Sequence, residues 1–204
     1  FGDLKITWDD DKGVIVKVQN NVTPSSIFKR NRVLKGVFEH ILGKPEQLGE
    51  VKTATGPTKE RLLDPNPNAF LIMDAVRKEF GTDMAIINAG NIRGFFEQGP
   101  LDSHQVFEVV PLKNNMVKLK LTEKEIVDAL KKGAKSFNDP GHKPGIIMPS
   151  GLKYTVSRSG ELKAASFIDK EGKENAIDVN NPNPNKVYTV ATDDFMASGG
   201  DNLL

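Results

Sequence analysis

The 204-residue chain contains no cysteine, which excludes disulfide bonds, thiolate metal sites and thiol redox chemistry. It also lacks a long apolar run, since none reaches the roughly 18 residues that a membrane-spanning helix needs. The chain also has no large excess of charge of either sign, because 28 Lys and Arg balance 27 Asp and Glu. A net charge of +1 gives no general attraction for nucleic acid or an anionic membrane, so any anion must be bound locally.

The familiar catalytic motifs are absent from the sequence too. It has no Walker loop and no HExxH, CxxC or GxSxG motif. The histidines, His40, His104 and His142, lie far apart and have no acid at metal-ligand spacing. Consecutive acids at residues 9–11 point in different directions, so they indicate a solvated turn rather than a metal site. Catalysis by this chain alone is therefore not expected.

What the sequence does contain is a mixture of strand and helix patterns. Alternating apolar residues predict a hairpin around the turn at residues 9–13. Helical spacing predicts a helix over 24–43 and another that includes 69–80, while Thr122 and Glu125 predict a capped helix that ends at Gly133. Residues 103–111 indicate a short helix or an irregular turn. Further strands are predicted at 83–87, 115–122, 152–157, 161–169 and 187–192. This pattern predicts a mixed α/β (α+β) domain with mainly antiparallel strands.

Two loops of small residues follow predicted strands, which is where ligands usually bind. They are "NAGNIR" at 88–93 and "DDFMASGGD" at 193–201. The guanidinium of Arg93 offers a rigid fork of donors for phosphate or sugar oxygens, and the small residues beside it allow close approach to the backbone. The alternative is that Asn88 and Asn91 bond their own turn while Arg93 pairs with a surface acid.

Together with "VVPLKNN", these loops resemble motifs of the C-terminal domain of the 5′-nucleotidase family, in the same order along the chain. That domain carries an Asn-Gly-Gly-Gly-Ile-Arg-like loop, then a Pro-Phe-Gly-Asn-like turn before a strand and a capped helix, and finally Asn-Phe-Leu-Ala-Asn-Gly-Gly-Asp-Gly. The segment "PSGLKYTV" is similar to a further element. The resemblance covers roughly residues 57 to 201 and implies a layered α/β/β/α domain.

In that family an upstream metallophosphoesterase domain hydrolyses the substrate with two divalent metal ions, and this domain binds the nucleoside. "FGDLKITWDD" resembles the tail of the upstream domain, so residues 1–20 are expected to be that tail or a linking hairpin and residues 21–204 the substrate-binding domain. The resemblance thus implies a fragment of a 5′-nucleotidase or 2′,3′-cyclic-nucleotide phosphodiesterase that is inactive alone. The implied location is periplasmic, secreted or cell-surface. The implied partners are a nucleotide or nucleoside and the upstream domain, with no nucleic-acid polymer and no membrane span.

The resemblance also implies roles for individual residues. Phe195 would stack on the base and Asp201 would accept hydrogen bonds from the ribose hydroxyls. Arg93 would hold substrate oxygens, Asn88 would contact the base or position the arginine, and Asn114 would contact the base. The full predicted substrate-binding set, which includes no catalytic residue and no metal ligand, is Arg61, Asn88, Gly90, Arg93, Leu112, Asn114, Phe195, Gly199, Gly200 and Asp201.

The sequence departs from the family pattern at several positions. Leu112 stands where the family has its second stacking aromatic, and Ala89 and Asn91 replace glycines. Arg61 falls near the family's upstream arginine. Leu112 keeps open a two-domain hydrolase for a non-nucleotide phosphoester or a sulfur ester, and a binding module without catalysis is a further alternative. Phe195 could instead belong to the core, as most phenylalanines do.

Overall fold

The computed structural model describes residues 2–9, 14–22, 44–139 and 144–204, and the chain forms two compact units, Phe1–Glu46 and Gln47–Leu204. In the first unit, β1 (Gly2–Asp9) pairs antiparallel with β2 (Val14–Val22), which confirms the predicted N-terminal hairpin. The predicted helix over 24–43 and most of the predicted acidic turn lie outside the described residues. The boundary proposed at residue 20 stays a prediction.

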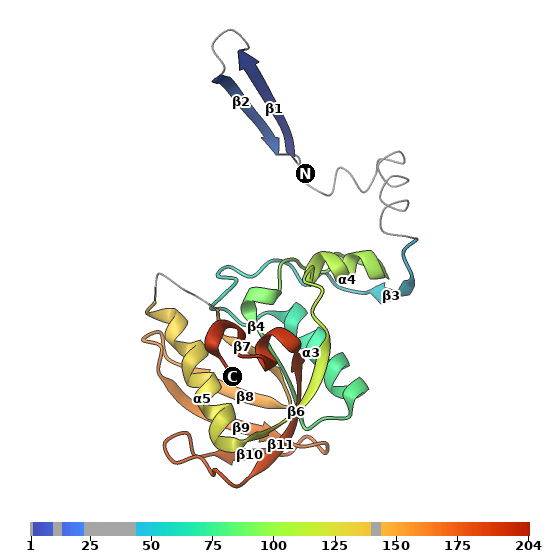
Figure 1. Cartoon of the computed structure of the whole chain (residues 1–204). Coiled ribbons are helices and arrows are strands. Elements are labelled where there is room, and N and C mark those ends of the chain that lie inside the picture. Colours follow the sequence, from blue (N-terminus) through green and yellow to red (C-terminus); the bar gives the residue numbers. More distant parts are fainter. Residues whose placement is uncertain (1, 10–13, 23–43, 140–143) are drawn as a thin grey trace. The chain divides into compact units, whose positions relative to one another are not determined.

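The second unit contains short strands and helices in alternation (Figure 1). In chain order they are β3 (Gln47–Val51), α3 (Pro67–Phe80), β4 (Met84–Asn88), η1 (Ala89–Asn91), β5 (Gly99–Asp102), α4 (Ser103–Val109), β6 (Met116–Thr122), α5 (Glu123–Ala134), η2 (Lys135–Phe137), β7 (Ile147–Ser150), β8 (Leu152–Val156), β9 (Leu162–Ile168), β10 (Glu174–Ile177), β11 (Val187–Asp193), α6 (Asp194–Ala197) and η3 (Gly200–Asn202).

The strands that the structure describes in this unit form three sheets. The largest has the order β6-β11-β4-β7, the second has the order β10-β9-β8, and β3 pairs with β5. Within these sheets β11 and β4 are parallel, and the other described pairs are antiparallel. Helix α3 packs on one face of the four-stranded sheet, while α5 and the second sheet share a core with its other face. The predicted mixed α/β fold with largely antiparallel strands is confirmed.

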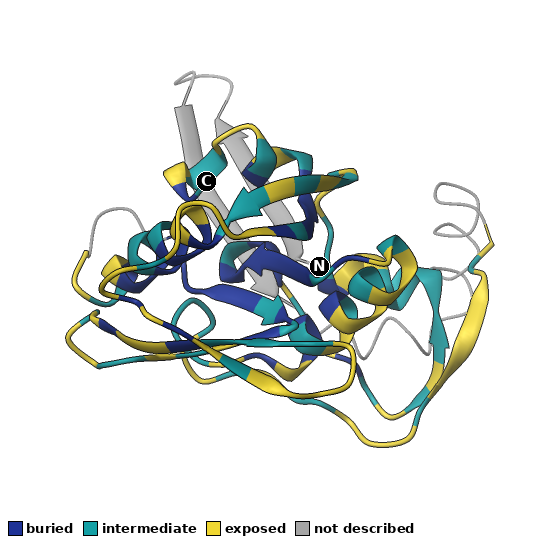
Figure 2. Ribbon diagram, turned by 90° about the horizontal axis from the view of Figure 1, so that it is seen from below, coloured by how far each residue is buried: buried dark blue, intermediate teal, exposed yellow. Residues whose placement is uncertain are grey.

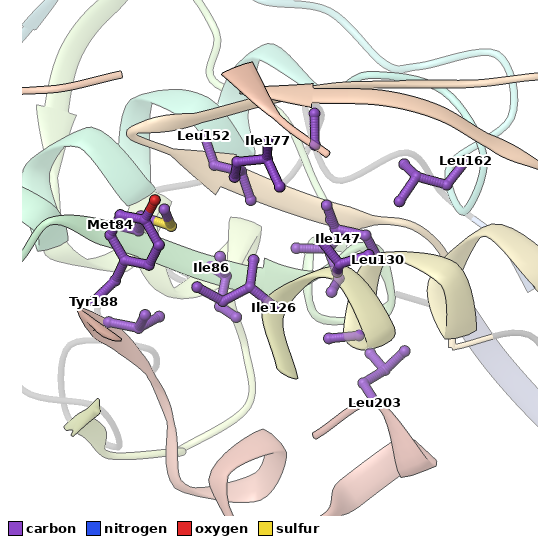
Figure 3. Close-up of a cluster of buried hydrophobic side chains, with 14 of the residues drawn as sticks. Met84, Ile86, Ile126, Leu130, Ile147, Leu152, Leu162, Ile177, Tyr188 and Leu203 are labelled. Carbon is purple, nitrogen blue, oxygen red and sulfur yellow. The ribbon is translucent and has the colours of Figure 1, made fainter. Parts of the chain in front are cut away.

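Strand β4 is buried along its whole length because both of its faces are covered (Figure 2). Met84 and Ile86 point into the core formed with α5 and the second sheet, which is drawn in Figure 3. Ala85 and Ile87 point into the core formed with α3. This two-residue alternation places Asn88, the last residue of β4, at the edge of the sheet where the first candidate loop begins.

The helix ends follow from local sequence. Asn66 caps α3 by accepting from the backbone N of Asn68, and Gly81 ends the helix in the left-handed conformation at φ 60°. Thr122 and Glu125 form the predicted capping box of α5. The predicted stop of α5 at Gly133 is wrong, because that helix continues to Ala134. A Cβ at Gly133 would lie 3.3 Å from the backbone O of Gly145, so this glycine serves close packing.

The start of α5 is tied to β11 through the buried carboxylate of Glu123. Its oxygens accept hydrogen bonds from Tyr188 Oη at 3.0 Å and from Asn183 N at 3.0 Å, and Lys186 Nζ lies 3.2 Å away. Burial alone would raise the pKa of this carboxyl. The hydrogen bonds from these three groups outweigh burial and hold the pKa below its ordinary value.

Replacing Glu123 with glutamine should reduce both stability and its dependence on acid. Because the folded pKa lies below the unfolded one, the ionised group stabilises the fold above pH 4.5, and this stabilisation is lost as pH falls through the folded pKa. Glu123→Gln should lower the free energy of unfolding at neutral pH by about 1–3 kcal/mol. Urea unfolding at a series of pH values measures the effect. Glu171→Gln, in an exposed turn, is the control, and an unchanged acid dependence in Glu123→Gln would contradict the assignment.

Candidate functional site

Three segments that are distant in sequence meet at one edge of the four-stranded sheet. Strands β4 and β11 are parallel, so their carboxyl ends lie together, and β6 begins beside the end of β11. This topology gathers residues 88–93, 114–115 and 193–201, and the red C-terminal segment accordingly lies near β4 in Figure 1. The carboxyl edge of parallel strands is a common place for ligand binding.

Asn88 reaches across this edge to the second candidate loop. Its Nδ2 donates to Asp201 Oδ2 at 2.7 Å, and the side chain is only 2% exposed. Among the described residues, nothing donates to its buried Oδ1. The alternative in which Asn88 bonds only its own turn is therefore wrong. Asn88 holds the carboxylate of Asp201, whose backbone is left-handed at φ 57°.

Asp193 joins all three segments, although sequence reasoning did not single it out. This carboxylate is 1% exposed and accepts from Asn91 Nδ2, from Asn114 Nδ2 at 2.9 Å and from Met196 N at 2.8 Å. Asn91 therefore also bonds a distant residue rather than its own turn. The local signal in the sequence was an acid before a short helix, and this signal could not reveal partners 79 and 102 residues away.

Phe195 lies on α6 with 42% of its surface exposed, which contradicts a core role. Leu112, the residue at the family's other stacking position, is also 42% exposed. The two glycines after α6 serve different purposes. Gly199 has φ 85°, a conformation that favours glycine, whereas a Cβ at Gly200 would lie 2.6 Å from the Phe195 ring and 2.5 Å from its backbone O.

The two candidate arginines lie together at the first loop. Arg61 Nη1 donates to the backbone O of Gly90 at 3.1 Å and of Ile92 at 3.4 Å. Burial and the nearby charge of Arg93 lower the pKa of Arg61. Arg93 itself is exposed, and within residues 44–139 and 144–204 it forms no ion pair with an acid. Arg61 thus supports the loop, and an anion beside Arg93 would relieve the repulsion between the two cations.

One cavity of this unit lies away from these loops. It has a volume of about 530 Å³ and is lined mainly by apolar side chains near α3, β7 and β8, with none of the candidate residues. In the part of the chain that the structure describes, no group of three or more His, Cys, Asp or Glu could hold a metal ion. None of the helices in that part is long and apolar enough to cross a membrane.

A mixed α/β domain with polar loops gathered at the carboxyl ends of two parallel strands is typical of a ligand-binding domain. Comparison with family models matches residues 49–204 to the 5′-nucleotidase C-terminal domain, and the chain belongs to that family. The resemblance found in the sequence is thereby confirmed.

Individual relatives agree with this assignment. The chain is 28% identical to protein UshA of Escherichia coli over 97% of its own length and 33% of UshA. It is 26% identical to the trifunctional nucleotide phosphoesterase protein YfkN of Bacillus subtilis, covering 94% of the chain and 14% of YfkN. The solved structure of a 5′-nucleotidase precursor from Thermus thermophilus is similar to the chain, with a TM-score of 0.68 and 23% sequence identity. The match covers 99% of the present chain and 41% of the Thermus thermophilus chain. The chain therefore spans a third or less of these two curated relatives.

Proposed function

We propose that this chain supplies the nucleoside-binding domain of a two-domain, metal-dependent nucleotide phosphohydrolase. Family membership and the name of the relative YfkN, a nucleotide phosphoesterase, support a phosphoester substrate. In this proposal the enzyme is a 5′-nucleotidase or a cyclic-nucleotide phosphodiesterase that acts in the periplasm, in the extracellular space or at the cell surface.

The observation that carries the proposal is an exposed aromatic ring beside a fixed carboxylate. Phe195 is half-exposed, and Asp201 follows it on the same short segment, held by Asn88. A base of any kind can stack on the ring, and one carboxylate can accept from two vicinal ribose hydroxyls. Arg93 would then attract the anionic part of the substrate.

Hydrolysis is assigned to a separate domain that carries the two divalent metal ions. The described residues of this chain do not fit such a centre, because they hold no suitable cluster of ligands. The isolated 204-residue chain is therefore expected to release no phosphate from nucleotides. The alternative of a non-nucleotide phosphoester or a sulfur ester, which rests on Leu112, remains a prediction, and so does the alternative of a binding module without catalysis.

Adenosine should bind the 204-residue chain weakly, with a dissociation constant on the order of a millimolar, because only a few contacts compensate for the entropy lost on association. An NMR titration should show shifts at residues 88–93, 112–114 and 195–201. Asp201→Asn should weaken adenosine binding but leave adenine binding nearly unchanged, since only adenosine carries ribose hydroxyls. Shifts confined to other residues, or no binding of adenosine, would reject the nucleoside site in favour of the alternatives.

A further inference from the structure

We propose that Asp193 is a positioning residue that sets the base preference of the site. It would do so by fixing the amide of Asn114 with its carbonyl oxygen available to the base. The inference rests on the proposed function, because it concerns how the same site reads a nucleoside. The inference predicts that the site prefers bases with an exocyclic amino group over bases that carry an oxo group at the same ring position.

The contacts of Asp193 fix the direction of the neighbouring amides. Its Oδ2 accepts from both Asn91 and Asn114, and its Oδ1 accepts from the backbone N of Met196. A carboxylate has no proton to donate, so only the NH₂ end of an amide can face it. Asn114 must therefore turn its Nδ2 toward Asp193. Because Asp193 is buried, water does not compete easily for these bonds.

This orientation decides what Asn114 can offer to a ligand. Within the described residues its Oδ1 accepts no hydrogen bond, and the side chain is only half-buried. Its carbonyl oxygen is thus the acceptor that remains for a ligand. An exocyclic amino group, as in adenine or cytosine, donates to such an oxygen, whereas the oxo group of hypoxanthine or uracil cannot.

Changing Asp193 to asparagine should remove the restraint on the orientation of the neighbouring amides. The new amide would keep an oxygen to cap α6 but would place its NH₂ group where two other NH₂ groups already point. Asn91 or Asn114 would then have to rotate, and Asn114 could turn its NH₂ group toward the ligand. The side chain would keep nearly the same shape, so packing would change little.

The test compares adenosine with inosine, which share the ribose and a stacking purine but differ in the amino or oxo group. We expect the original chain to bind adenosine about 2- to 10-fold more tightly than inosine, and this ratio of affinities is the range for one neutral hydrogen bond. In Asp193→Asn this ratio should fall to one or below. The side-chain NH₂ signals of Asn91 and Asn114 should shift in the NMR spectrum of the same variant.

A matched control is provided by the next residue. Asp194 accepts from Asn115 Nδ2 at 3.0 Å at an exposed position, so Asp194→Asn makes the same chemical change without touching Asn114. This control should keep the ratio of the original chain. Asn114→Ala should bring the ratio to one. Adding Asp193→Asn to Asn114→Ala should not change the ratio further, because Asp193 acts through Asn114.

The outcomes separate the two proposals. If the original chain binds adenosine but the ratio is one, or is unchanged in Asp193→Asn, the role of Asp193 is overturned while the nucleoside site stands. If the original chain binds neither nucleoside, the proposed function fails and the inference fails with it. Should Asp193→Asn not fold, Asn114→Ala decides, since an adenosine preference that survives in it overturns the inference.

Discussion

Phe195→Ala is expected to weaken adenosine binding by about 5- to 150-fold, which corresponds to the 1–3 kcal/mol that base stacking on an aromatic ring contributes. The ring is 42% exposed, so its removal leaves no large cavity in the core. Met196, the next residue on α6, is buried and anchors the helix in the variant. The free energy of unfolding should therefore change by much less than the free energy of binding.

Calorimetry or NMR titration with adenosine measures the loss, and urea unfolding measures the stability of the same samples. Phe107→Ala is a suitable control, because Phe107 on α4 is 39% exposed and is not among the candidate site residues. Equal adenosine affinity in the original chain and in Phe195→Ala would refute the stacking role.

Gly200→Ala should disturb both the fold and the site. The added Cβ would lie 2.5 Å from the backbone O of Phe195 and 2.6 Å from its ring, and real Cβ atoms do not approach so closely. The ring can rotate away, but the carbonyl can move only with the backbone of α6. Overpacking of this kind costs about 1–3 kcal/mol, and we expect a similar loss in free energy of unfolding. Adenosine binding should fall as well, because Phe195 is displaced.

Gly199→Ala and Gly172→Ala separate this clash from simple backbone strain. Both glycines are left-handed, at φ 85° and 82°, and a Cβ at either would meet no atom within 4 Å. Each alanine should cost about 1 kcal/mol through strain alone. Gly172 lies in the turn between β9 and β10, so its variant should bind adenosine normally. If Gly200→Ala behaves like Gly172→Ala, the contact with Phe195 has no functional importance.

Much of the fold could be predicted because its longer elements carry strong local signals. The capping box of α5 and the apolar stripe of α3 are examples, and both helices occur where they were expected. Strands β7 and β10 were not predicted. Each has only four residues, and β7 contains Pro149 at the edge of its sheet, so neither shows a clear alternation.

The candidate residues could be named because their motifs occur in order along the chain, but their contacts could not. Asn88 and Asp201 are 113 residues apart, and nothing near either residue indicates the other. Arg61 could be placed only near the family arginine. The structure shows that its guanidinium contacts the backbone of the 88–93 loop, an interaction that depends on how the chain folds back.

Leu203 connects the interior of the domain to the ligand-binding edge. Its side chain is 1% exposed and belongs to the core shared by α5 and the second sheet (Figure 3). Asp201 stands only two residues before it in the sequence. At the other end of this short segment, Asp193 and Met196 are buried as well. Residues 197–202 therefore form a short segment that is anchored in the interior at both ends. Substitutions deep in the core, far from any ligand, can thus change the affinity for the ligand by shifting these anchoring residues.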